Sequence, residues 1–255
     1  MLTPELIVAF LTLSFLEIIL GIDNIIFISI LAGRFPKKDR SKLMKAGLFL
    51  AMIMRILLLM GVNWLTKMQT TLFQIATPLF TSNISIQAII LFGGGLFLLH
   101  KSTREIFHKV EEFEESNEGN KKKSPISFSK ALVQIVLIDI VFSFDSILTA
   151  IGMTNGVSFA LWIMIAAVII SILIMMLFAT PVSDFVNNHP SLQILGLSFL
   201  LLIGFMLIAE AANLSDTEIF GASIGRIPKG YLYFSIAFSL GVEMLNMQIR
   251  KRKKN

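Results

Sequence analysis

The chain has 255 residues, 55% of them hydrophobic, and a mean hydropathy of +0.78, which is typical of a protein that crosses a membrane several times. The apolar segments use most of the chain, which excludes a separate soluble domain of the usual size, ~100 residues. Cysteine is absent, which excludes disulfides and thiolate metal sites, and basic membrane flanks account for the net charge of +5, which argues against nucleic-acid binding.

Seven apolar segments predict seven transmembrane helices in chain order, near residues 5–31, 43–65, 84–100, 128–152, 157–179, 191–211 and 228–248. The predicted fold class is all-α, a polytopic membrane helical bundle that forms a single transmembrane domain over residues 1–255. The connection 101–127 is charged, with a run of glutamates between 111 and 118 followed by three lysines. We expect a solvated cytoplasmic loop there, with a cation-collecting or regulatory loop as the alternative.

The positions of the Lys and Arg residues predict the orientation of the bundle, because cytoplasmic connections carry an excess of them. Most of the 22 lie in the first connection, in the third connection and in the C-terminal tail. This alternation places the N-terminus outside and the C-terminus inside. The connection around 180–190 has no Lys or Arg, so its side follows from the helix count alone.

An acidic motif in the first span returns in the fourth. The segment LEIILGIDNI at 16–25 corresponds to IDIVFSFDSI at 138–147, so Glu17 matches Asp139 and Asp23 matches Asp145. An ionisable group in the hydrocarbon core costs about 2.5–3.5 kcal/mol on insertion scales and is therefore usually functional. We interpret the two copies as one site that is built twice.

The spacing of the motifs predicts an inverted repeat, because three helices make up each copy. Repeat 1 covers about 5–100, repeat 2 covers about 128–211, and the helix at 228–248 is additional. Outside the motif the similarity is faint, with Gly95-Leu-Phe-Leu-Leu matching Gly204-Phe-Met-Leu-Ile. Inverted repeats recur in transporters, whose substrate sites lie near the membrane midplane.

Within each motif the two acids are six residues apart, which on an ideal helix separates them by about 9 Å and about 120°. A straight helix would therefore not align their carboxylates. Either each acid faces a different neighbour, or the helix is locally broken near Gly21, which Ser143 replaces in the second copy.

The four acids face one intramembrane base, Arg55, so full ionisation leaves an excess of three negative charges. Protons or a bound cation must balance that excess, so metal and protons should compete for the site. Oxygen ligands favour Mg²⁺, Ca²⁺ or Mn²⁺ over Zn²⁺ or Cu⁺. The three histidines lie at or beyond predicted span ends, where surface positions are expected.

Three further polar residues are candidate accessory groups. Arg55 either pairs with a site carboxylate and sets its charge in the absence of substrate, or is a structural counter-ion. Ser146 offers a hydroxyl beside Asp145, and Glu243 lies near the inner end of the last span, where it could be an entry group for a cation.

The chain resembles the TerC family in a set of motifs: Leu16-Glu17-x-x-x-Gly21-x-Asp23-Asn24, Met52-Ile53-Met54-Arg55, the Asp139/Asp145 pair and Pro228-Lys229-Gly230-Tyr231. The resemblance covers almost the whole chain. It implies a protein of bacterial inner membranes related to LysE-like transporters, whose members include Mn²⁺ exporters and proteins linked to tellurium resistance. The metal-handling residues that it implies are Glu17, Asp23, Asn24, Asp139 and Asp145.

These observations lead to the hypothesis of a transporter that exports divalent metal cations, most of all Mn²⁺, through a midplane carboxylate site in exchange for protons. We expect no enzymatic activity and no cofactor. The expected partners are the transported ion and the lipid bilayer, and a homo-oligomer is compatible with the sequence. One alternative is a membrane scaffold or assembly factor without flux. Another is an intramembrane aspartyl hydrolase that uses Asp23 and Asp145, although the chain lacks a Gly-x-Gly-Asp signature.

Overall fold

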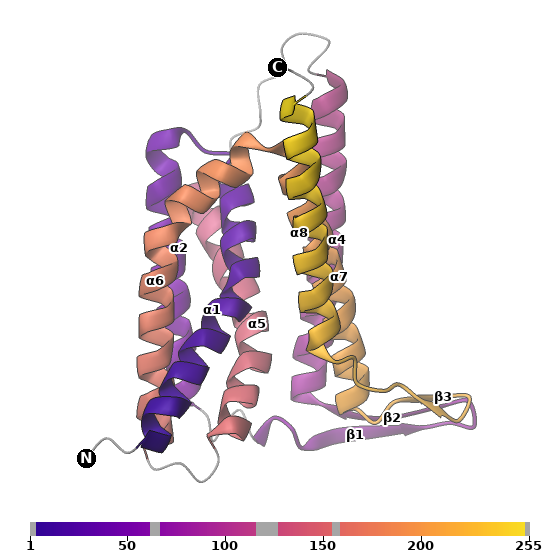
Figure 1. The fold of residues 1–255 in the computed structure, drawn as a ribbon. Coiled ribbons are helices and arrows are strands. Elements are labelled where there is room, and N and C mark those ends of the chain that lie inside the picture. Colours follow the sequence, from indigo (N-terminus) through magenta and orange to yellow (C-terminus); the bar gives the residue numbers. More distant parts are fainter. Residues whose placement is uncertain (1–3, 62–66, 116–126, 155–158, 253–255) are drawn as a thin grey trace. The chain divides into compact units, whose positions relative to one another are not determined.

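The computed structural model describes residues 4–61, 67–115, 127–154 and 159–252 (Figure 1). At Asp23 and Asp145 the structure describes the helical backbone but not the side chains. The chain divides into two compact units. The first unit contains Met1–Lys67 and Lys122–Asn188, and the second contains Met68–Lys121 and His189–Asn255.

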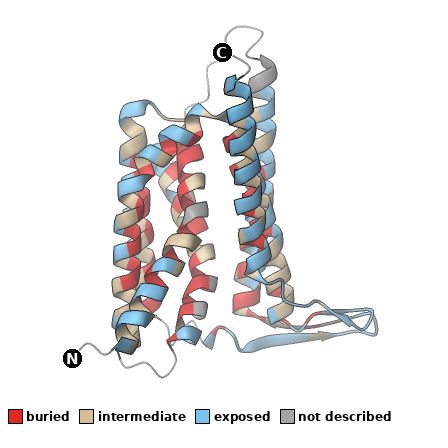
Figure 2. Cartoon of the chain, viewed as in Figure 1, coloured by how far each residue is buried: buried red, intermediate tan, exposed pale blue. Residues whose placement is uncertain are grey.

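The described residues of the first unit form a bundle of four helices: α1 (Pro4–Ala32), α2 (Lys37–Met60), α5 (Phe128–Met153) and α6 (Ala160–Asn188). Helix α1 packs mainly against α6, and α2 packs against both α5 and α6. Buried aliphatic side chains such as Leu43 and Ile135 fill the core. Figure 2 marks the buried residues of the chain in red. Two glycines make room for side chains of the facing helices, because a Cβ on Gly21 would lie 2.3 Å from Met175 Sδ, and one on Gly47 would lie 3.0 Å from Ile135 Cδ1.

Helices α1 and α6 run in the same direction. The Asn187 side-chain amide donates to the Ser29 carbonyl oxygen over 3.1 Å, so the C-terminal ends of the two helices meet. The connection around 180–190, which has no Lys or Arg, therefore lies at the same end of this unit as the basic first connection. Helix α6 continues through Pro181 beyond the predicted end at 179, and Figure 1 shows that its last turns bend, as a proline inside a helix favours.

In the part of the second unit that the structure describes, the helices are α4 (Ile86–Glu115), α7 (Pro190–Leu214) and α8 (Lys229–Arg252). Helices α4 and α7 pack along each other and come closest at two glycines. A Cβ on Gly95 would lie 2.7 Å from the Gly204 carbonyl oxygen, and a Cβ on Gly204 would lie 3.1 Å from the Gly95 carbonyl oxygen. Only glycines permit this approach of the two backbones.

A small antiparallel sheet completes the second unit. Its strands are β1 (Thr71–Ala76), β2 (Phe80–Ser85), β3 (Glu218–Ile219) and β4 (Ala222–Ser223), in the order β1-β2-β3-β4. Strand β2 leads directly into α4, and β3 follows shortly after α7. The two connections that the predicted orientation places on one side of the membrane thus meet in one sheet. The all-α prediction did not include it.

Six of the described helices, α1, α2, α4, α6, α7 and α8, are long and apolar enough to cross a membrane. The seventh predicted span, α5, is helical at the predicted position, but its membrane crossing stays a prediction. The predicted membrane orientation and the predicted inverted repeat also stay predictions.

The prediction of a loop that begins at residue 101 is wrong over 101–115, where α4 continues to Glu115. Lysine and glutamate are good helix formers, and the segment has no glycine or proline before Gly119. Exposed pairs such as His108 and Glu111, 3.7 Å apart, lie on the continued helix. Residues 116–126 of the predicted loop lie outside the described residues.

Candidate functional site

A buried polar network lies in the core of the first unit, where α1, α2 and α5 meet. It contains Glu17 and Asn24 from α1, Arg55 from α2, and Asp139 and Ser143 from α5. Their exposed fractions are between 0% and 5%. The network is therefore shielded from the exterior and brings together residues from distant parts of the chain.

Arg55 joins the two acids. Its Nη1 forms an ion pair with Glu17 Oε2, and its Nη2 lies 2.9 Å from Asp139 Oδ1. Its Nε donates a longer bond of 3.5 Å to Asp139 Oδ2. Because arginine stays protonated in proteins and presents its donors as a planar fork, one guanidinium can hold both carboxylates.

Asp139 receives two further hydrogen bonds. The Asn24 side-chain amide donates to its Oδ1 over 3.0 Å, and the Ser143 hydroxyl donates to its Oδ2 over 3.2 Å. Both carboxylate oxygens are thus hydrogen-bonded by residues from three helices. Such satisfaction is needed in an apolar interior, because an unpaired buried charge is strongly destabilising.

Helical periodicity explains why these side chains meet. Glu17 and Asn24 are seven residues apart, which is about two turns, so they share one face of α1. Asp139 and Ser143 are four residues apart and share a face of α5. Both helices are continuous through the motif, so of the two alternatives the local break near Gly21 is not observed, and Gly21 instead allows α6 to pack closely through Met175.

The structure therefore brings together three of the five predicted metal-handling residues: Glu17, Asn24 and Asp139. The side chains of the other two, Asp23 and Asp145, are not described. Among the described side chains there is no group of three or more His, Cys, Asp or Glu that could hold a metal ion. The complete ligand set stays a prediction.

The accessory candidates have different surroundings. Arg55 lies at the centre of the network, paired with both described acids. The Ser146 hydroxyl donates to the Ser143 carbonyl oxygen of its own helix over 3.2 Å. Glu243 belongs to α8 in the second unit, where its Oε2 lies 3.5 Å from the Asn246 side-chain nitrogen. Arg55 is thus the accessory candidate that ion pairs join to the described acids of the motif, Glu17 and Asp139.

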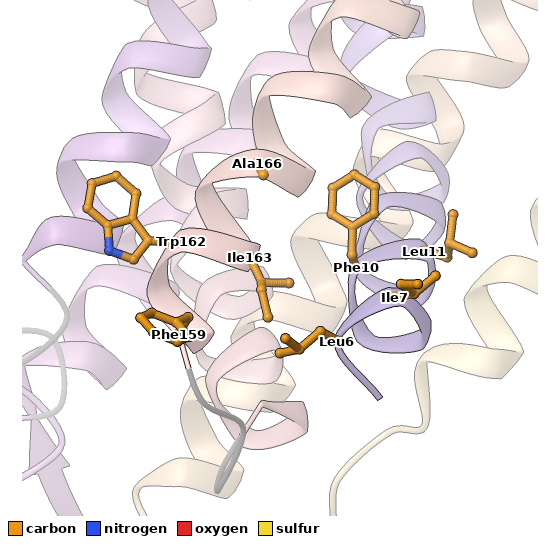
Figure 3. A pocket seen from close by; sticks show the side chains of 8 residues that line it. All are labelled: Leu6, Ile7, Phe10, Leu11, Phe159, Trp162, Ile163 and Ala166. Carbon is orange, nitrogen blue, oxygen red and sulfur yellow. The ribbon is translucent and has the colours of Figure 1, made fainter. Parts of the chain in front are cut away.

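An apolar groove of about 710 Å³ lies elsewhere in the first unit, between the N-terminal ends of α1 and α6 (Figure 3). Phe10 of α1 and Trp162 and Ile163 of α6 are among its lining residues, none of which is charged. The groove offers no carboxylate to a cation, so the buried network is the better candidate site.

The comparisons agree with the membrane fold. The model of the integral membrane protein TerC family matches residues 2–255. The chain belongs to the TerC family. This TerC-family protein is 43% identical over 251 residues to a UPF0053 protein of Haemophilus influenzae, with 98% of this chain and 97% of the relative covered. It is 42% identical over 250 residues to the UPF0053 inner membrane protein YgdQ of Escherichia coli K12, with 98% and 95% covered. It is a multi-pass inner membrane protein.

Longer members of the TerC family also match. The UPF0053 inner membrane protein YoaE of Escherichia coli K12 is 41% identical over 249 residues, which cover 98% of this chain but 44% of YoaE. No solved structure matches the chain.

Proposed function

We propose that this TerC-family protein exports divalent metal cations through a site built on the paired acids of α1 and α5. Mn²⁺ is the leading candidate for the transported ion. The observation that carries the proposal is the buried network in which Glu17 and Asp139, the first acids of the two motif copies, approach a single positive group. A polar cluster of this kind inside a membrane bundle is typical of an ion pathway.

The balance of charge favours a cation as the substrate. Two carboxylates and one guanidinium leave the described network with one negative charge, and ionised Asp23 and Asp145 would add two more. The oxygen atoms of the acids and of the Asn24 amide suit Mg²⁺, Ca²⁺ or Mn²⁺. Because ligand carboxylates must be deprotonated to bind metal, protons would compete with the ion, and that competition would permit exchange.

The packing of the helices within each unit supports an inverted repeat. Helix α1 packs against α6, and its proposed counterpart α5 packs against α2, the counterpart of α6. Gly95 and Gly204, which the repeat makes equivalent, face each other's backbone where α4 and α7 cross. Rocking of the two repeats, or protonation of the acids, would release the ion outside. The outward direction rests on the family resemblance.

Flux measurements on reconstituted protein test the transport step. Vesicles that contain the protein should accumulate Mn²⁺ when a pH gradient is imposed, and a panel of divalent ions should reveal the selectivity. A scaffold without flux would give the same uptake as empty vesicles. A proteolytic function would instead be revealed by cleavage of peptides by the purified protein.

Variants of Asp23 and Asp145, the second acids of the two motif copies, test the site. In cells that lack their manganese exporters, Asp23→Asn and Asp145→Asn should fail to restore manganese tolerance although the protein still inserts. Glu111→Gln removes an exposed carboxylate at the end of α4 and is the matched control, which should restore tolerance fully. Rescue by both Asp variants would contradict the proposal.

A further inference from the structure

The sheet of the second unit is amphipathic. Its register pairs Phe73 with Ile84 and Phe80 with Ile219, and directly paired residues of antiparallel strands point to the same face. The apolar face therefore carries Phe73, Ile75, Phe80, Ile84 and Ile219. The polar face carries Gln74, Thr81, Asn83, Glu218 and Ser223.

The apolar face is largely uncovered. The exposed fractions are 51% for Phe73, 37% for Phe80 and 43% for Ile219. Figure 2 shows most of the sheet as exposed. At the far end of the sheet Leu79 and Phe220 are exposed by 60% and 77%, and they lie together because the Phe220 backbone N–H donates to the Leu79 carbonyl oxygen. The apolar face thus ends in an apolar tip.

Phe220 has an unusual backbone conformation. It and Gly221 connect β3 to β4 in a two-residue turn, with φ angles of 53° and 75°. Such turns favour Asn or Gly at the first position, and a left-handed conformation costs other residues about 1–2 kcal/mol. The turn therefore places a large aromatic side chain at a strained, exposed position.

The apolar face is directed toward the helices of its own unit. Ser82 lies on this face of β2, and its hydroxyl is 3.0 Å from the Thr217 hydroxyl, with both residues buried. On the polar face the neighbouring bond from Asn83 to Asp216 is exposed. Where the sheet joins the helices, the apolar face is therefore covered and the polar face is open. Farther from the helices the apolar face is exposed as well. Figure 1 shows that the sheet extends sideways from the ends of α4 and α7.

We propose that the apolar face and tip of this sheet rest on the lipid bilayer. Helices α4 and α7 are candidate spans, and they carry exposed aromatic side chains such as Phe92 and Phe205. Because β2 continues into α4, the apolar face of the sheet would lie at the membrane boundary, where an apolar face can leave water by resting on lipid. The proposal rests on the membrane location of the protein and is independent of the transported substrate.

Two neighbouring residue pairs allow a matched test. Phe80 and Ile219 are partners on the apolar face, and Thr81 and Glu218 are the adjacent partners on the polar face. The chain has no cysteine, so single cysteines at these four positions can carry a nitroxide label without other changes. The labelled proteins would be placed in vesicles of phosphatidylethanolamine and phosphatidylglycerol. Collisions of the label with oxygen, which partitions into lipid, would be compared with collisions with a water-soluble nickel complex.

We expect oxygen collisions to dominate at positions 80 and 219 and nickel collisions to dominate at 81 and 218. Dominant nickel collisions at all four positions would place the sheet in water and overturn the proposal. Low accessibility to both reagents at 80 and 219 would also overturn it, because protein, such as a second copy of the chain, would then cover the face.

A tryptophan experiment keeps an aromatic residue on the apolar face. In a background with Trp64→Phe and Trp162→Phe, brominated lipids should quench the fluorescence of Phe73→Trp more strongly than that of Gln74→Trp, its neighbour on the polar face. Equal quenching at the two positions would contradict contact of the apolar face with lipid.

Discussion

Arg55 Nη2 lies 2.9 Å from Asp139 Oδ1, and this ion pair ties the C-terminal part of α2 to the middle of α5. The same guanidinium holds Glu17 of α1 through Nη1. One buried guanidinium therefore connects the consecutive helices α1 and α2 with α5, which is distant in the sequence. The arrangement leaves neither described acid of the motif without a charged partner.

Arg55→Gln should lower the stability of the protein, because it leaves Glu17 and Asp139 as neighbouring buried carboxylates without a cation. Removal of one member of a buried ion pair typically costs about 3–5 kcal/mol. Thermal unfolding of the purified protein in detergent at neutral pH measures the effect. The double variant Arg55→Gln/Asp139→Asn should lose less than the sum of the two single losses. Additive losses would mean that the pair is not energetically coupled.

Asn24 gives a second, more conservative test of the network. Asn24→Ala removes one neutral donor from Asp139 and should cost about 1 kcal/mol. Asn24→Asp is nearly isosteric but places a second carboxylate next to Asp139, so it should destabilise the protein more at neutral pH. Acidification protonates the added carboxylate and should reduce the difference between the variants. A difference in unfolding temperature that does not change with pH would contradict this reading.

The sequence predicted the positions of the helices because membrane spans are set by length and hydropathy. The predicted span 128–152 and the observed α5 at Phe128–Met153 agree closely. Hydropathy did not predict that α4 continues to Glu115. Hydropathy falls after His100, whereas the helix propensity of the residues that follow does not.

The repeated motif singled out Glu17 and Asp139, and the structure pairs both with Arg55, while their equivalence in a repeat stays a prediction. It did not decide between the two roles considered for Arg55, because the place of α2 beside both α1 and α5 depends on tertiary packing. The structure places Arg55 between the two acids, and its role in the transport cycle stays a prediction.

A weak signal for the sheet was present in the sequence. The apolar residues at 73 and 75 would lie on one face of a strand, and so would those at 80 and 84 on the other side of Pro78. The segments are short, however, and β3 and β4 contain two residues each. Their pairing with β2 joins residues that are distant in the chain, which local periodicity does not indicate.

If the acids bind Mn²⁺ in competition with protons, the ion should stabilise the folded protein in a pH-dependent way. Addition of MnCl₂ should raise the unfolding temperature in mildly alkaline buffer, because a ligand that binds only the folded state stabilises it. The increase should shrink on acidification, since protons occupy the ligand oxygens. Asp139→Asn should reduce the increase, and Glu111→Gln should leave it unchanged. An equal response of both variants would place the binding of Mn²⁺ outside the network.

The contact between Gly95 and Gly204 predicts a sharp difference between two glycines of α4. Gly95→Ala would bring a methyl group to 2.7 Å from the Gly204 carbonyl oxygen and from Ile208 Cγ1, so the helices must separate. Overpacking of this kind typically costs about 1–3 kcal/mol. Gly93→Ala is the matched control, because a Cβ there has no neighbour within 4 Å, and alanine favours the helix. Thermal unfolding in detergent should show a clear loss for Gly95→Ala and none for Gly93→Ala. Equal behaviour of the two variants would mean that α4 and α7 do not approach at Gly95.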